Sequence, residues 1–187
     1  MSNGQKACGI DLGSSEIVVA VVDSSDPLGT KLVPNMLSNE TTPGVVKIYR
    51  EVRTIGEDAA ATATMCPQNV YHHLPLVLKY VDCIEQLQTL YPDMCFNMKM
   101  DSERGVVFDV QDDSLVSEIS ILHAITMLFN YVFKIVATKY PEHLNKAVIA
   151  VPSGFSPKCV RIVADAAHLA GFKEVVITNT DKAQTFK

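Results

Sequence analysis

The sequence predicts an α/β fold in which a mixed β-sheet is covered by flanking helices. Two apolar, β-branched segments, Ala7–Leu12 and Ile17–Val22, are separated by a four-residue turn. Four residues cannot hold a crossover helix, so these strands should be antiparallel neighbours. Towards the C-terminus the pattern becomes strand, helix, strand, which is typical of a parallel βαβ unit. A sheet that opens with a hairpin and continues with parallel strands should therefore share one core.

Shorter elements should follow the first hairpin. Strands are expected near Lys31–Met36 and at Val45–Tyr49, and Arg53–Gly56 should form a short strand or turn. The Ala-rich stretch Glu57–Met65 starts with acidic residues, which favour a helix N-terminus, and Pro67 should end it. Residues 68–112 have mixed periodicity, and Pro75 should interrupt any long helix through them.

The longest helix is expected at Ser114–Tyr140. Apolar residues recur there every three or four positions, so they form one buried face. Ser114 can cap the start of this helix, and Pro141 follows its end. The acidic run that contains Asp109, Asp112 and Asp113 is expected to be a solvated turn and the start of this helix.

The C-terminal part should contain a strand, a helix and a last strand. Lys146–Val151 has the pattern of a buried strand. Ser156 is a suitable N-cap with Pro157 at the first helical position, and Gly171 should stop the helix. Val175–Thr178 is the last expected strand.

Composition limits the class of protein. The 187 residues are 48% hydrophobic, which suits a folded core in one domain or two small lobes. The net charge of −5 and the lack of a long basic run argue against a nucleic-acid partner. No run of 18 apolar residues predicts a membrane span, and the N-terminus lacks a targeting pattern. We therefore expect a cytoplasmic protein with no membrane or nucleic-acid partner.

The cysteines and histidines predict no metal site. Five cysteines without C-x-x-C spacing indicate reduced thiols. The set Cys66, His72, His73 and Cys83 lacks the spacing of a zinc module. The pair His72–His73 could form a metal-binding or acid/base pair, but adjacent side chains point in different directions, so surface or partly satisfied histidines are expected instead. Two cysteines are expected to be buried, Cys8 and Cys159.

The turn after the first strand has two interpretations. It lacks the lysine and the following helix of a P-loop, and it lacks the three glycines of a dinucleotide-binding fingerprint. The N–H groups of Gly13, Ser14 and Ser15 could still form an anion-binding nest, and Asp11 could hold Mg²⁺ through water. From the turn alone, a plain hairpin is favoured, because Asp-x-Gly-Ser turns are common.

Four ordered segments resemble the ATPase domain of the Hsp70 family. "GIDLGSSEIVVAVVD" resembles its first phosphate loop, G-I-D-L-G-T-T, and "NETTPGVVKI" resembles N-R-T-T-P-S-x-V. "IGEDAAATATMCPQNV" resembles its I-G-x-x-A-K segment and the Asn-Thr-Val that follows. "NKAVIAVPSGFSPKCVRIVADAAHLAGFKEVVITN" resembles A-V-I-T-V-P-A-x-F and the helix ending D-A-x-x-I-A-G-L.

This resemblance implies an actin-like, ribonuclease-H-like lobe, the first of the two lobes of that ATPase domain. A core subdomain of about 1–40 and 114–187 would carry an inserted smaller subdomain of about 41–113. The resemblance also implies ATP or ADP with Mg²⁺ as cofactors. Asp11 would hold the metal through water, and Gly13, Ser14 and Ser15 would contact phosphates. The second lobe and the substrate domain have no counterpart, so we expect either a piece of a longer protein or a short relative.

Three positions depart from the family pattern. Leu74 stands where the catalytic lysine is expected, and Thr180 stands where a glutamate organises the metal's water shell. Leu cannot stabilise charge on a transferring phosphoryl group. Lys79 and Asp181 lie nearby in the sequence.

The third departure concerns the relay of nucleotide state. Pro152 is retained, but the family's relay arginine is replaced by Val160, and the neighbouring Arg161 should lie on a different helix face.

The resemblance and its departures favour one function and leave an alternative. The first hypothesis is an Hsp70-like chaperone fragment, connected with the stress response, whose lobe binds ATP with weak or lost hydrolysis. Its partners would be nucleotide, other chaperones or co-chaperones, and unfolded clients only where a substrate domain follows. The alternative is a non-catalytic scaffold or a regulatory partner of a true Hsp70. A sugar-kinase-type enzyme is less favoured, because the four segments match the chaperone family.

Overall fold

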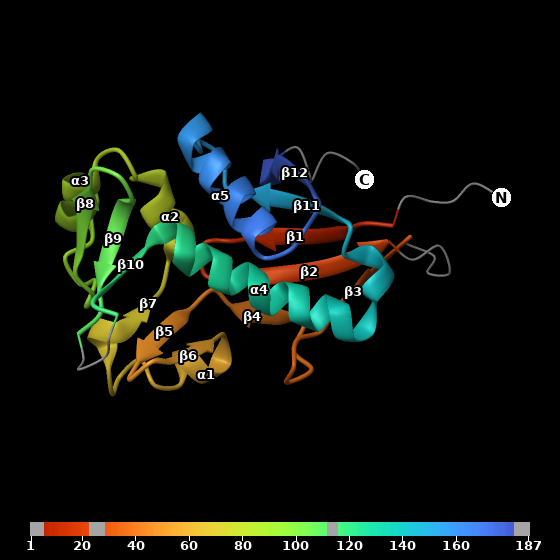
Figure 1. Ribbon diagram of the computed structural model, residues 1–187, viewed down its shortest axis with the longest axis horizontal. Helices are drawn as coiled ribbons and strands as arrows, with labels where there is room; N and C mark the ends of the chain where they lie inside the picture. Colours follow the sequence, from red (N-terminus) through yellow and green to blue (C-terminus); the bar gives the residue numbers. More distant parts are fainter. Residues whose placement is uncertain (1–5, 23–28, 112–115, 182–187) are drawn as a thin grey trace.

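The computed structural model describes residues 6–22, 29–111 and 116–181. Its largest sheet has the strand order β12-β11-β1-β2-β3, and β4 also pairs with β2 (Figure 1). Strand β1 is antiparallel to β2 and parallel to β11, which is parallel to β12. The mixed sheet and the opening hairpin are therefore confirmed. The strands are β1 Cys8–Leu12, β2 Glu16–Val22, β3 Thr30–Leu32, β4 Thr41–Pro43, β11 Lys146–Val151 and β12 Glu174–Asn179.

The two faces of this sheet differ in burial because side chains alternate along each strand. In β1, Cys8, Ile10 and Leu12 are buried, while Gly9 and Asp11 on the other face are half-buried. Helices α4 (Ile121–Lys139) and α5 (Pro157–Leu169) lie over the buried face (Figure 1). Burial raises the pKa of the Cys8 thiol to about 12, and Cys159 is also buried, as predicted.

Helix α4 begins later than the sequence predicts. Its N-cap is Ser120, whose hydroxyl accepts from the His123 N–H at 3.3 Å. The preceding residues Glu118–Ser120 form β10, which pairs with β9. Ser114, the predicted cap, lies outside the described residues. The predicted apolar face is confirmed, since Ile125, Phe129, Val132 and Val136 are all buried.

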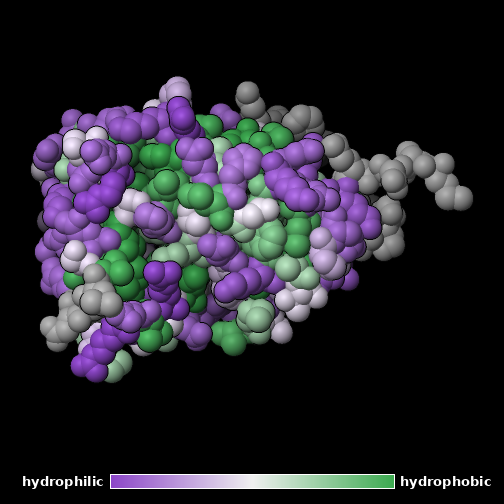
Figure 2. Space-filling model, in the orientation of Figure 1, coloured by the Kyte–Doolittle hydropathy of each residue, from purple (hydrophilic) through white to green (hydrophobic). Residues whose placement is uncertain are grey.

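Among the described helices, only α4 is long and apolar enough to cross a membrane by length and composition. The core helix of a globular protein meets the same criterion, and the buried face of α4 accounts for this composition. Hydrophilic side chains cover most of the face seen in Figure 2, with hydrophobic patches between them.

The middle of the chain forms two small sheets. One has the order β6-β5-β7 and the other β10-β9-β8. Their strands are β5 Val46–Tyr49, β6 Val52–Ile55, β7 Val70–Tyr71, β8 Met98–Asp101, β9 Gly105–Asp109 and β10 Glu118–Ser120. The short helices are α1 Glu57–Ala60, α2 Leu74–Lys79 and α3 Ile84–Leu90, with 3-10 turns at Pro67–Asn69 and Pro141–His143. The division into a core of 1–40 and 114–187 and an insert of 41–113 stays a prediction.

Several predicted elements are shorter in the structure. The strand predicted at Lys31–Met36 ends at Leu32, because Asn35 accepts the N–H groups of Leu37 and Asn39 and so holds a turn. The helix predicted at Glu57–Met65 ends at Ala60 and continues as turns.

Two further predictions concern the middle of the chain. Pro75 lies in the first turn of α2 and does not break it; the interruption comes at residues 80–83. Asp109 is the last residue of β9, and its carboxylate lies 3.4 Å from the Lys99 ammonium. It is therefore not part of a helix start, whereas Asp112 and Asp113 lie outside the described residues.

The caps predicted for α5 are confirmed. The Ser156 hydroxyl accepts from the Cys159 N–H at 3.3 Å, and Pro157 is the first helical residue. At the other end Gly171 has a φ of 111°, a left-handed conformation that favours glycine. Its N–H donates to the His168 carbonyl at 3.0 Å, which closes the helix.

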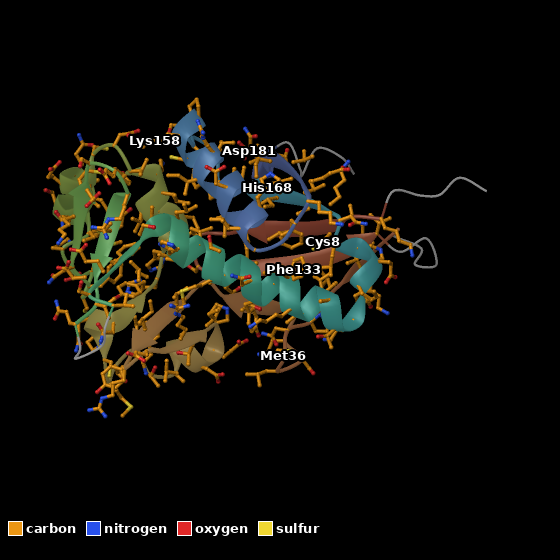
Figure 3. All side chains as sticks on the ribbon, viewed as in Figure 1. Cys8, Met36, Phe133, Lys158, His168 and Asp181 are labelled. Atoms are coloured by element: carbon orange, nitrogen blue, oxygen red, sulfur yellow. The ribbon has the colours of Figure 1, made fainter. Side chains whose placement is uncertain are left out.

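Two contacts join α5 to the segment around α2. The buried Cys159 thiol donates to the Leu78 carbonyl at 2.9 Å. Beside it, the Lys158 ammonium forms an ion pair with the Asp82 carboxylate at 2.7 Å. Figure 3 labels Lys158 near the start of α5. The first contact is buried and the second is exposed to water, so the thiol is the better protected of the two.

Candidate functional site

The parallel strands β1, β11 and β12 end at the same edge of the sheet. Their register aligns Asp11 with Ala150 and Ala150 with Thr178. The connections that leave this edge contain the predicted site residues. In parallel sheets ligands bind beyond the carboxyl ends of the strands. The structure thus brings to one edge Asp11, Gly13, Ser14, Ser15, Pro152 and Thr180, whose functional roles remain predictions.

Asp11 is the acidic group of this edge. Its side chain extends from the half-buried face of β1, and within the described parts of the chain its carboxylate has no hydrogen bond or ion pair. Burial raises the pKa of Asp11 above its ordinary value. A carboxylate that is partly desolvated and unpaired favours a nearby cation, so Asp11 is suited to hold a hydrated Mg²⁺.

The turn after β1 is fixed by its own backbone. A Cβ added to Gly13 would lie 2.7 Å from the Glu16 carbonyl oxygen, so the hairpin itself requires glycine here. The Gly44 N–H donates to the Ser15 carbonyl at 2.8 Å and supports the turn from the side. Ser14 and Ser15 are exposed. The glycine alone therefore indicates no ligand, whereas the exposed hydroxyls are accessible to one.

Leu74 does not line this site. It is the first residue of α2 and is fully buried in the hydrophobic core. The position at which the family resemblance expects a lysine is thus a core position in this protein. A charged group there would lose its hydration without gaining a partner, which is costly.

His73, immediately before Leu74, contacts the turn directly. Its Nδ1 lies 3.3 Å from the Ser14 carbonyl oxygen, and its backbone is left-handed, with a φ of 52°. The His72 ring packs edge-on against His73 at 4.8 Å between centroids and against Phe96 at 5.2 Å. Burial and the charge of His73 both lower the pKa of His72. The prediction of surface or partly satisfied histidines agrees with their half-buried side chains and with the His73 Nδ1 contact, although the two rings pack against each other instead of diverging.

Lys79 is a second residue that sequence reasoning did not place. Its Cε lies 4.0 Å from the position that a Cβ on Gly154 would occupy, in the connection after β11. Helix α2 therefore begins beside the turn after β1 and ends beside the connection after β11. The sequence around Gly154 does not predict that Lys79 lies close to it, because this proximity depends on how α2 packs.

Thr180 and Asp181 follow the last strand. The Thr180 hydroxyl donates to the Val151 carbonyl at 3.0 Å, so it is engaged with the backbone of β11. The Ser153 hydroxyl donates to the Asp181 carboxylate (Figure 3). Asp181 is thus a second carboxylate at this edge, one position after the place where the resemblance expects a glutamate.

Pro152 lines a cavity of about 120 Å³ between the connection after β11 and the end of β12. Val160 of α5 lines the same cavity. Arg161 is exposed and forms an ion pair with Asp165 at 3.7 Å, so it lies on a different face of the helix from Val160. The predicted difference in direction between Val160 and Arg161 is confirmed.

The cysteine and histidine side chains form no metal centre in the described residues. The five cysteines are free thiols. No group of three or more His, Cys, Asp or Glu side chains in residues 6–22, 29–111 and 116–181 is arranged to hold an ion.

Comparison with known proteins identifies the family. The sequence model described as "Hsp70 protein" matches residues 7–186. The chain belongs to the Hsp70 family. Its mixed sheet with flanking helices agrees with the actin-like fold of the family's ATPase domain.

The similar proteins are chaperones of much greater length. Hypoxia up-regulated protein 1 of Danio rerio is 28% identical over 177 residues, which cover 93% of this chain and 17% of that protein. A ribosome-associated molecular chaperone of Zygosaccharomyces rouxii is 29% identical over 96% of this chain and 28% of its own length. Chaperone protein dnaK of Gracilaria tenuistipitata var. liui is 25% identical, with shares of 95% and 28%.

Membership of the family supports a chaperone-like function. Proteins of this family bind nucleotide with Mg²⁺ and act with co-chaperones or clients. The chain spans between about a sixth and just over a quarter of the length of these relatives. The residues of the edge fit such a ligand, because Asp11 has no competing partner among the described residues and the serines are exposed.

Proposed function

We propose that this chain is the phosphate- and metal-binding lobe of an Hsp70-type chaperone in which ATP hydrolysis is weak or lost. The observation that carries the proposal is the contrast between Asp11 and Leu74. Asp11 remains at the edge of the sheet without a partner among the described residues, whereas Leu74 is fully buried. Binding groups are thus present, and the expected catalytic cation is absent from its position.

The residues of this chain would hold the ligand in three ways. The backbone N–H groups and hydroxyls of Gly13, Ser14 and Ser15 would donate to phosphate oxygens. Asp11 would accept from water molecules of a bound Mg²⁺, which supplies charge neutralisation for the phosphates. The second lobe of the family's ATPase domain would close the site from the other side.

Hydrolysis would lack its electrostatic support in this lobe. Phosphoryl transfer depends almost entirely on positioning and on charges that stabilise the transition state. Leu74 supplies no charge, and the Thr180 hydroxyl is committed to the Val151 carbonyl. Removal of one such stabilising group typically costs about 10²–10³ in rate. Bound ATP would therefore persist much longer than in an ordinary Hsp70.

The test uses the full-length protein, because half of the nucleotide pocket lies outside this lobe. Calorimetry with Mg-ATP should give micromolar binding, which Asp11→Ala should weaken. Single-turnover hydrolysis should be slow or absent. A rate equal to that of an ordinary Hsp70 would contradict the loss of catalysis. Absence of detectable binding would instead favour a non-catalytic scaffold or a regulatory partner of another Hsp70.

The remaining roles belong to the whole protein and are part of the proposal. We expect co-chaperones as partners, and unfolded clients where a substrate domain follows. A role in the stress response is suggested by the name of one relative, hypoxia up-regulated protein 1. A cytoplasmic location is also proposed, and imaging of the tagged protein would test it.

A further inference from the structure

His73 touches the turn that is proposed to bind phosphate. The Ser14 carbonyl is a hydrogen-bond acceptor only, so the His73 Nδ1 that lies 3.3 Å from it must carry the proton. In the neutral ring, Nε2 is then an unprotonated acceptor. It can donate a hydrogen bond to an anion only when the ring takes up a second proton.

The structure leaves Nε2 available for this. Nδ1 alone has a hydrogen bond to a described residue, and the ring is held against the turn by that bond and by the edge contact with His72. His73 is also only half-buried, so both protons and ligands can reach it. The Nδ1 contact thus orients the imidazole, while Nε2 is available to bind a ligand.

Several titratable or charged groups near His73 affect the charge on its ring. His72 lies edge-on to it, Asp11 and Glu16 flank the turn, and Lys79 lies at the far end of α2. Burial and the charge of His73 both lower the pKa of His72. The neighbouring Leu74, fully buried, contributes no charge.

We propose that His73 is a ligand for the nucleotide's phosphates, and that its protonated ring supplies at this turn a positive charge that no lysine provides. This inference rests on the proposed function, since it assumes that the turn meets a phosphate. It makes phosphate affinity depend on pH near neutrality, whereas a lysine would be charged throughout that range. Protonation gives the ring its second N–H, which donates to a phosphate oxygen.

The sharpest variant is His73→Asn in the full-length protein. The asparagine amide N–H₂ can take the place of the Nδ1–H and donate to the Ser14 carbonyl. Asparagine also tolerates the left-handed backbone at this position. The variant therefore keeps the support of the turn and removes only the second nitrogen. His168→Asn on α5 is the matched control, because His168 is exposed and contacts the Phe172 carbonyl at 3.0 Å instead (Figure 3).

The experiment measures the Kd of Mg-ADP by calorimetry at pH 6 and at pH 8. A hydrogen bond from a charged donor predicts binding about five- to tenfold tighter at pH 6 than at pH 8 in the natural protein. His168→Asn should keep this ratio. His73→Asn should lose this five- to tenfold difference, so that only a change due to the nucleotide itself remains between pH 6 and pH 8. Any titration of the nucleotide itself occurs in all three proteins and cancels.

A second readout follows the ring directly. NMR titration of the His73 ring signals should show a higher pKa with Mg-ADP bound than without it, because an anion stabilises the charged ring. An unchanged pH ratio in His73→Asn, or an unshifted ring pKa in the complex, would overturn the inference and leave the proposed function intact. Failure of the natural protein to bind Mg-ADP at either pH would overturn the proposed function as well.

Discussion

Two regions of the molecule meet at the turn after β1 and differ in the burial of their side chains. One is the carboxyl edge of strands β1, β11 and β12, and the other is the segment from β7 to α2. At the edge, Asp11 and the serines face outwards and remain accessible. In the neighbouring segment Leu74 is fully buried, and the same helix joins α5 through the Leu78 carbonyl. Packing therefore leaves the side chains of the edge accessible, whereas the position at which the resemblance expects a lysine is part of the core.

Restoring the family's lysine at position 74 should destabilise the fold and should not restore hydrolysis. Leu74→Lys places an ammonium among buried side chains, so we expect a loss of at least about 3 kcal/mol in the free energy of unfolding. Hydrolysis should not return. Urea unfolding and single-turnover assays measure both effects. The control Leu90→Lys changes a residue that is 60% exposed and should cost within about 0.5 kcal/mol. A stable Leu74→Lys protein with restored hydrolysis would refute the core assignment.

The turn at the edge should be sensitive to any side chain on its glycine. Gly13→Ala brings a methyl group to 2.7 Å from the Glu16 carbonyl, and we expect a loss of about 1–3 kcal/mol in stability. Gly9→Ala in the preceding strand β1 is the control, since its Cβ would lie at an ordinary 3.7 Å from the Ala20 carbonyl. Thermal unfolding of both variants checks the difference. Equal stabilities would mean that the hairpin adjusts freely.

Asp11 should cost stability when no cation is bound. Its pKa is raised by burial, so the folded state binds its proton more tightly than the unfolded state does. The cost is absent below the ordinary aspartate range, appears as pH rises through that range and persists at neutral pH. Asp11→Asn should therefore raise Tm at pH 7 but not at pH 3. It should also remove the stabilisation that Mg-ADP gives. A lower Tm at pH 7 would show that the carboxylate has a stabilising partner.

The ion pair between α5 and the α2–α3 connection should have the smallest effect. Lys158 and Asp82 are both more than half exposed, and such pairs contribute about 0–1 kcal/mol. Lys158→Met should thus lower stability by about 0.5 kcal/mol or less. A double-mutant cycle with Asp82→Asn measures the coupling, which should fall with added salt. A coupling energy well above 1 kcal/mol would show that this ion pair contributes substantially to the packing of α5 against the α2–α3 connection.

Strand β11 and helix α5 could be predicted from local sequence. Lys146–Val151 matches β11, and Ser156, Pro157 and Gly171 mark the ends of α5 as predicted, because caps and β-branched runs act over a few residues. The start of α4 differs from the prediction because Glu118–Ser120 extends the sheet with β9, and strand pairing is not visible in a local pattern.

The site could be predicted only in part. The position of Asp11 and of the turn follows from the order of strands, since parallel strands end at one edge. The burial of Leu74 and the contact from His73 to Ser14 depend on how α2 packs. No local sequence pattern predicts that His73, which precedes Leu74 and Pro75, has a left-handed backbone conformation. The sequence therefore identified Leu74 as a departure from the family pattern, but its burial and the contact from His73 were found only in three dimensions.

The pairing of β1 with β11 also sets the timing of folding. Cys8 pairs with Ala147, so roughly 140 residues must emerge from the ribosome before the parallel edge can form. At the usual rate of synthesis this takes about 7–30 s. During that interval β1 can pair with β2 but leaves its other side open, and open apolar strand edges promote aggregation. A lobe of a chaperone family thus has, during its own synthesis, an interval in which it needs protection.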